Sequence, residues 1–180
     1  MIHRDFASKG HRGFGEAPPP SAHAAAALNL YSQMQQAKAA VDATENRIRS
    51  ADLGASNSNV ASLLEGAAAY KLGAEAAGRV VNLASEAKKE IDITVGMNAM
   101  LIPPAVQADV EYSIPHYWIM YLSYVKQSGA YSDRATARGA PPPVDGQQQQ
   151  PAPKVTAAKS DNTMLLLLAA AAGAYFYTRR

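Results

Sequence analysis

Residues 62–84 read SLLEGAAAYKLGAEAAGRVVNLA, and this stretch decides the fold. Its apolar residues recur at alternating steps of four and three, which is the spacing of one face of a helix. That face consists of Leu63, Ala67, Tyr70, Ala74, Ala77, Val81, Ala84 and then Ile91. Gly66, Gly73 and Gly78 interrupt it, and each weakens a helix by about 1 kcal/mol relative to alanine. In return, the small residues leave a smooth face that lets a second backbone approach closely.

The same rhythm is found earlier in the chain. The breaker Pro18-Pro19-Pro20 precedes Ser21, a suitable N-cap residue, and the pattern then predicts a helix over about 21–53. Its apolar seam consists of Leu30, Met34, Ala37, Val41, Thr44, Ile48 and Ala51. Residues 54–59 are rich in turn formers and lead into the next helix, which we expect over about 58–91. The sequence therefore predicts an antiparallel helical hairpin within an all-α fold.

The predicted hairpin has few bulky side chains with which to build a core. Because alanine and glycine bury little apolar area, such a hairpin is hard to stabilise alone. We therefore expect self-association through the apolar seam to supply the missing buried area. The predicted self-association residues are Leu30, Met34, Val41, Ile48, Leu63, Tyr70 and Val81.

A third, aromatic-rich helix is predicted over about 115–127 and completes a helical body over 21–130. Pro115 suits its first turn, and Ser128-Gly129 predicts its end. Its side chains are apolar or aromatic nearly all round, and three interpretations fit this pattern. The helix packs as core on the open end of the hairpin, docks a partner protein, or lies at a bilayer surface. The residues of the predicted partner interface are Tyr117, Trp118, Met120, Tyr121 and Tyr124.

Three other segments have weaker patterns. Residues 91–106 begin with strand-like alternation but contain Gly96 and Pro103-Pro104, so we expect a loop or a short extended piece. Residues 1–20 read as a flexible basic arm. Residues 131–161 are rich in proline and glutamine, which predicts a disordered linker.

The uncharged run from Asn162 to Thr178 predicts a single transmembrane helix. A helix of about 17 residues spans about 25 Å, against a hydrocarbon core of about 30 Å, and so lies at the short end of the transmembrane range. Leucines drive its insertion, while the aromatic residues beside two arginines suit the membrane interface. The main residues of this predicted anchor, 162–180, are Leu165, Leu166, Leu167, Leu168, Tyr175, Phe176, Tyr177, Arg179 and Arg180. A helix buried in the core of an oligomer is the alternative interpretation.

The composition offers little for chemistry. The chain has 180 residues, a formal net charge of +2 and no cysteine, which excludes disulfides, thiolate metal sites and cysteine nucleophiles. Its four histidines are scattered, and the sequence holds no phosphate-binding glycine loop and no serine nucleophile signature. We therefore predict a non-enzymatic protein with no catalytic residue, metal site or cofactor. Arg4, Lys9 and Arg12 predict at most a weak, salt-sensitive contact with nucleic acid.

Two parts of the chain resemble minor virion proteins of bacteriophages. The run from Leu165 to Tyr177, followed by Arg179-Arg180, is similar to the hydrophobic helix of small single-pass proteins in tailless phages with an internal membrane. The stretch from Tyr31 to Ala40 and the alanine-glycine helix resemble phage ejection or pilot proteins, which form a conduit for DNA.

The first resemblance implies a structural protein that links a virion or host-cell membrane to a protein assembly such as a capsid. Its partners would be the lipid bilayer, further copies of itself and another structural protein. The second resemblance implies a conduit-forming protein. A tail-anchored cellular adaptor is a third interpretation of the same layout.

Overall fold

Three long helices make up the part of the chain that the structure describes. The computed structural model describes residues 18–55 and 59–141, and these residues contain helices and no strand. The helices are α1 (Pro20–Ala55), α2 (Val60–Gly96) and α3 (Pro104–Thr136). The all-α prediction is confirmed for this part of the chain. Residues 1–17 of the predicted arm, residues 142–161 of the predicted linker and the whole predicted anchor lie outside the described residues.

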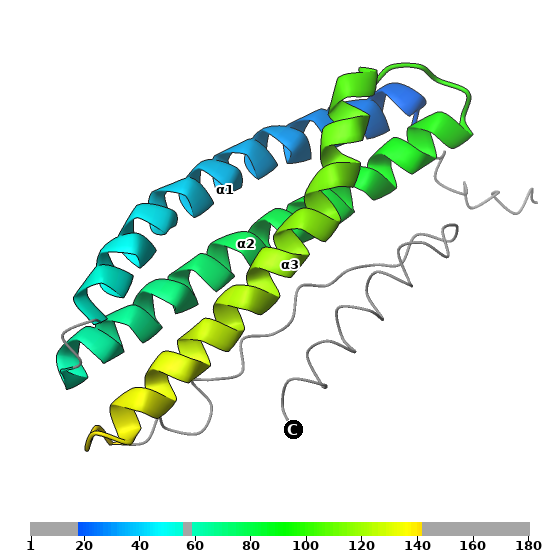
Figure 1. Cartoon of the computed structure of the whole chain (residues 1–180). Coiled ribbons are helices and arrows are strands. Elements are labelled where there is room, and N and C mark those ends of the chain that lie inside the picture. Colours follow the sequence, from blue (N-terminus) through cyan, green and yellow to red (C-terminus); the bar gives the residue numbers. More distant parts are fainter. Residues whose placement is uncertain (1–17, 56–58, 142–180) are drawn as a thin grey trace, which may run out of the picture.

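Helix α2 runs through the middle of an elongated three-helix rod (Figure 1). α1 and α3 both run antiparallel to α2, so the predicted hairpin is present as α1 and α2. α2 packs along its length on both neighbours, whereas α1 and α3 meet mainly through long side chains. A helix that is covered on two sides must present small or apolar residues over much of its circumference. This requirement explains why α2 is rich in alanine and glycine.

Two glycines of α2 let aromatic rings of α3 approach its backbone. A Cβ atom at Gly66 would lie 2.5 Å from the ring of Tyr131, and one at Gly73 would lie 2.9 Å from the ring of Tyr124. Ile48 of α1 also approaches Gly73, at 3.1 Å from the same notional Cβ. At these two positions, the smooth face predicted from the sequence receives tyrosine rings.

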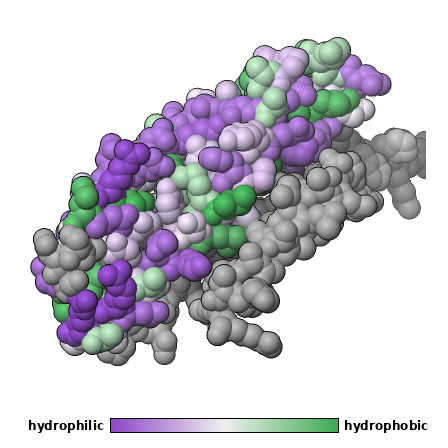
Figure 2. Space-filling view, viewed as in Figure 1, coloured by the Kyte–Doolittle hydropathy of each residue, from purple (hydrophilic) through white to green (hydrophobic). Residues whose placement is uncertain are grey.

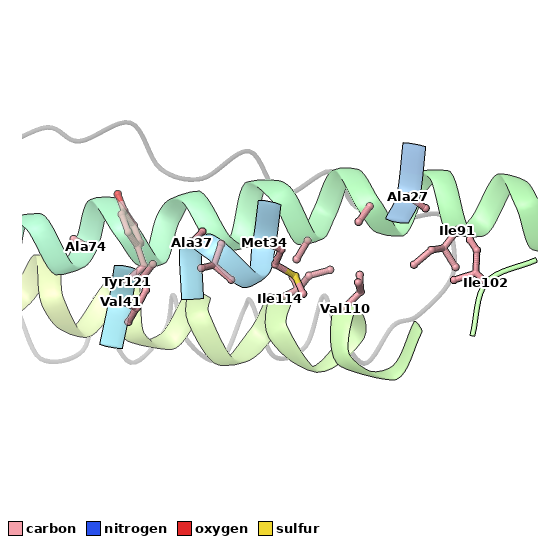
Figure 3. Close-up of a cluster of buried hydrophobic side chains, with 14 of the residues drawn as sticks. Ala27, Met34, Ala37, Val41, Ala74, Ile91, Ile102, Val110, Ile114 and Tyr121 are labelled. Atoms are coloured by element: carbon pink, nitrogen blue, oxygen red, sulfur yellow. The ribbon is translucent and has the colours of Figure 1, made fainter. Parts of the chain in front are cut away.

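The main core lies between the three helices, over the half of the rod nearest the α2–α3 junction (Figure 3). Met34 of α1 is fully buried there and belongs to the same cluster as Val110 and Ile114 of α3. Towards the junction, Ile91 and Ile102 close the cluster. Alanines of α1 and α2 fill the space between these larger side chains, which is why the helices pack closely.

The prediction of a loop or extended piece over 91–106 was wrong at both ends. α2 continues to Gly96, with Ile91 and Thr94 buried and Ile93 exposed, which is helical and not strand-like spacing. α3 begins at Pro104, because proline is well tolerated in the first turn of a helix, where its missing N–H has no partner to lose.

Helix α3 is also much longer than the predicted 115–127. Pro115 lies inside it and not in its first turn, and Ser128-Gly129 does not end it. The helix ends where Gly139, with φ of 96°, donates its N–H to the carbonyl of Thr136, while the N–H of Ala140 reaches the carbonyl of Ala135. Residues 131–136 are therefore helical and not linker, because Tyr131 and Ala135 are buried against α2.

Candidate interaction surface

A polar cluster joins α1 to the first turns of α3. Lys38 of α1 donates to both carboxylate oxygens of Asp109 of α3, at 2.7 and 2.9 Å, and Gln35 donates to the same carboxylate at 2.7 Å. Burial alone would raise the pKa of Asp109, but the hydrogen bonds from Lys38 and Gln35 outweigh it and lower that pKa. These groups satisfy one another, so the cluster holds α1 and α3 together.

A second cluster gathers tyrosine hydroxyls around Asp52, close to the end of α1. Tyr70 of α2 donates to one carboxylate oxygen at 2.9 Å, and Tyr131 of α3 donates to the other at 2.5 Å. Burial and the neighbouring carboxylate raise the pKa of Tyr131 to about 12 and raise that of Tyr70 even further. Both phenols are therefore held neutral, and the cluster ties all three helices together.

The predicted partner interface lies mostly against the core. Tyr121 is buried, and its ring stacks on Trp118 with centroids 5.7 Å apart. Tyr117, Met120 and Tyr124 are partly buried, and all pack with Trp118 against the main core cluster. Of the three interpretations of this helix, the core one describes these five side chains. The exposed side of α3 instead carries Tyr112 and Ile119.

The predicted self-association residues also face the inside of one chain. Met34, Val41, Ile48, Leu63 and Val81 are buried, and Leu30 and Tyr70 are partly buried. Their neighbours are the other two helices of the same rod. The bulky side chains that the hairpin lacks are thus supplied by α3, and a second copy is not required to cover this seam. The predicted anchor residues, 165–180, lie outside the described residues.

Large exposed apolar side chains gather at the end of the rod where α2 turns into α3 (Figure 2). We call this group the apolar tip. It consists of Ile93, Val95, Met97, Met100 and Leu101. Met100 is 96% exposed, and the other four are 40–52% exposed. This is the densest run of exposed apolar residues along the described chain.

The local backbone explains why the tip projects. Asn98 adopts the left-handed conformation, with φ of 55°. Its N–H donates to the carbonyl of Val95, and the N–H of Ala99 donates to the carbonyl of Thr94. This is a Schellman motif, which ends α2 and turns the chain outward. Pro103 and Pro104 then restart the helix after only a few residues. Met100 and Leu101 lie in this short connection, where neither helix can cover them.

Ionic contacts form a belt just inside the tip. Lys88 of α2 bonds to Asp92 at 3.0 Å and to Glu111 of α3 at 3.3 Å, while His23 of α1 contacts Glu90 at 2.6 Å. Burial would lower the pKa of Lys88, but the two carboxylates outweigh it and raise that pKa. Beyond this belt, no charged residue occurs from Ile93 through Ala108.

Other kinds of site have less support in the described residues. Among them, no group of three or more histidine, aspartate or glutamate side chains is placed to hold a metal ion. None of α1, α2 and α3 is apolar enough along its length to cross a membrane. Comparisons of the chain with protein-family models, with curated proteins and with solved structures found no match.

The apolar tip is the feature that the sequence prediction missed. The segment was interpreted as a loop, so its side chains were not assigned to any surface. A usable signal was present, because a charge-free run containing seven large apolar residues follows directly after the charged segment Lys88–Asp92. Together with an N–H-free Pro103-Pro104 pair, that run indicates an exposed apolar turn between two helices.

Proposed function

We propose that this chain is a non-enzymatic structural protein, tethered to a membrane by residues 162–178, whose three-helix rod holds a protein assembly such as a phage capsid at that membrane. The observation that carries the proposal is the uncharged run from Asn162 to Thr178, bounded by Lys159 and Asp161 on one side and Arg179 on the other.

The layout of the rod agrees with a mechanical role. Polar side chains bond between helices at Asp52, which is exposed, and at Asp109, which is partly buried, so the polar groups with unusual surroundings serve packing. Perturbed pKa values in such a network are expected from structural pairing as well as from catalysis. A stiff rod that ends about 20 residues before a membrane segment is suited to spacing one body from another.

The conduit interpretation has less support. A conduit would need the alanine-glycine face of α2 for contact with other copies or for lining a channel. Within one chain, α1 and α3 already cover that face, with Ala69, Ala74 and Ala77 fully buried. We therefore favour the tether over the conduit.

Flotation of the full-length protein with liposomes tests the tether. We expect the native chain to float and the variant Leu166→Arg with Leu168→Arg to float far less at the same lipid concentration, because each charge opposes insertion by several kcal/mol. The matched control is Leu166→Ala with Leu168→Ala, which keeps the run uncharged and should still float. If the native chain does not float, the membrane tether is refuted. Leakage of dye from the liposomes would favour the conduit instead.

A further inference from the structure

We propose that the apolar tip (Ile93, Val95, Met97, Met100 and Leu101) is a second membrane contact, which inserts into the surface of a lipid bilayer. The proposal goes beyond the tether, since it concerns residues 93–101 at one end of the rod and stands whether or not residues 162–178 span a membrane. Four features support it: the exposure of the tip, its lack of charged residues, the hydrogen bonds of its backbone, and a chain long enough to bring the tip and the predicted anchor to one membrane.

The exposure of the tip suits a fluid lipid bilayer, whose acyl chains can adapt to its shape. Met100 projects almost completely free of the protein, at 96% exposure, and Leu101 beside it is half exposed. Of the other three residues, Ile93 and Val95 lie in the last turn of α2, and Met97 directly follows it. A convex group of flexible aliphatic and thioether side chains can enter acyl chains without a preformed complementary pocket.

The tip can enter an apolar phase without burying a charge. The charged residues nearest to the tip in sequence, Asp92 and Asp109, are bonded to Lys88 and Lys38 respectively. Asn98 is the one polar side chain between Ile93 and Val106 that is exposed, since Thr94 is buried and its hydroxyl donates to the carbonyl of Glu90. The tip thus avoids the main cost of moving a protein surface out of water.

Much of the backbone at the tip is also satisfied internally, which a membrane requires more strictly than a protein partner does. The N–H groups of Met97, Asn98 and Ala99 bond to carbonyls of the last turn of α2. Pro103 and Pro104 have no N–H, and the side chain of Gln107 donates to the carbonyl of Ile102 at 3.0 Å. These bonds lower the number of backbone N–H groups that insertion would desolvate.

A second copy of the chain fits the tip less well. A stable interface needs about 800 Å² from each partner, whereas four of the five tip residues are already about half covered. The tip also lacks tryptophan, tyrosine and arginine, the residues that dominate binding energy between proteins. Its composition and size favour lipid.

The chain is long enough to bring the tip and the predicted anchor to one bilayer. α3 is 33 residues long, so the tip lies about 50 Å from the other end of the rod. The roughly 20 residues from 142 to 161 can span at most about 70 Å. An anchored rod can therefore reach back to the same membrane, and the anchor would raise the effective concentration of the tip there.

Site-specific fluorescence tests the proposal in the full-length protein. Because the chain has no cysteine, Met100→Cys gives a single attachment point for an environment-sensitive dye. Ala68→Cys, exposed on α2 towards the far end of the rod, is the matched control. With phosphatidylcholine vesicles, we expect the Met100 label to shift to the blue and to be quenched by lipids labelled about 5–10 Å below the headgroups, with no change at residue 68.

Charge substitutions provide the second measurement. Met97→Asp with Leu101→Asp should lower vesicle partitioning by about tenfold or more in the Leu166→Arg, Leu168→Arg background, measured at high lipid concentration. Leu64→Asp, at a residue that is 44% exposed, is the control and should change vesicle partitioning little. Circular dichroism checks that each variant keeps its helices.

The outcomes separate this proposal from the tether. If the native chain floats but the Met100 label stays in water, the tip proposal is overturned and the tether stands. If the Met100 label shifts in the Leu166→Arg, Leu168→Arg chain, the tip binds lipid by itself. A shift that depends on protein concentration and occurs without vesicles would overturn the proposal in favour of self-association.

Discussion

The ring of Tyr131 on α3 lies against the backbone of α2 at Gly66, so closely that a Cβ atom there would be 2.5 Å from two ring carbons. The hydroxyl of the same tyrosine reaches across to Asp52 of α1. One side chain therefore crosses the rod and contacts all three helices, and the absence of a side chain at residue 66 makes this possible.

Gly66→Ala should destabilise the rod. Alanine would gain about 1 kcal/mol of helix propensity, but displacing the Tyr131 ring costs about 1–3 kcal/mol and disturbs its bond to Asp52. Gly129→Ala is the control, because a Cβ atom there meets nothing within 4 Å. We expect Gly129→Ala to stabilise the protein by up to about 1 kcal/mol. Urea denaturation of both variants measures the difference, and equal effects would show that the ring does not require glycine.

The periodicity of the sequence was enough to predict α1 and α2. Steps of four and three placed Met34 and Val41 on one face of α1 and Leu63 on one face of α2, and all three are buried. Periodicity could not say what covers that face. Self-association was predicted because the hairpin has few bulky side chains, whereas α3 runs along most of the rod and supplies them.

The ends of α3 were missed because local signals were given more weight than packing. Pro115 was interpreted as the start of a helix, although a proline inside a long helix is tolerated when tertiary contacts hold the flanking turns. The true end was readable, since Gly139 followed by Pro141 is a common way for a helix to stop. Because aromatic residues occur on all sides of this helix, their pattern does not indicate which side packs in the core. The sequence therefore could not distinguish the buried Tyr121 from the exposed Tyr112.

Raising the pH above 10 should unfold the rod progressively. The ordinary pKa of tyrosine is about 10, and that of Tyr131 is raised to about 12 in the fold, so the folded state disfavours the phenolate. The stabilisation is complete below pH 10 and is lost as the pH rises through about 12. Tyrosinate absorbance and circular dichroism followed together measure this transition. Tyr131→Phe should reduce the pH dependence, and Tyr112→Phe, at an exposed residue, should leave it unchanged.

Asp109→Ala should lower the free energy of unfolding by more than the loss of an exposed ion pair does. It would leave the ammonium of Lys38, whose side chain is 16% exposed, without its carboxylate, at a cost of about 1–3 kcal/mol. Glu45→Ala is the control, because its contact with Arg49 is 3.9 Å long and exposed, and such pairs contribute about 0–1 kcal/mol.

Acid should destabilise the native chain partly by protonating Asp109. The pKa of Asp109 is lowered in the fold, so its stabilisation is present above about pH 4 and is lost as the pH falls through the folded value. Urea denaturation across this range should show a smaller acid loss in Asp109→Ala than in the native chain. An equal loss in both would mean that other carboxylates dominate.

Val41→Asp tests whether Val41 packs inside one chain or in a contact between copies. Val41 is 1% exposed and lies between α1 and its neighbours, so the aspartate would be an unpaired charge inside the rod. We expect a cost of about 3–5 kcal/mol, which is most of the stability of a typical small domain. Circular dichroism should therefore show a large loss of helix. Leu72→Asp, at a residue that is 38% exposed on α2, introduces the same charge outside the core and should keep the helical signal. If Val41→Asp instead kept its helices and halved the mass measured by light scattering, α1 would be repacking between copies, and the seam predicted from the sequence would be correct after all.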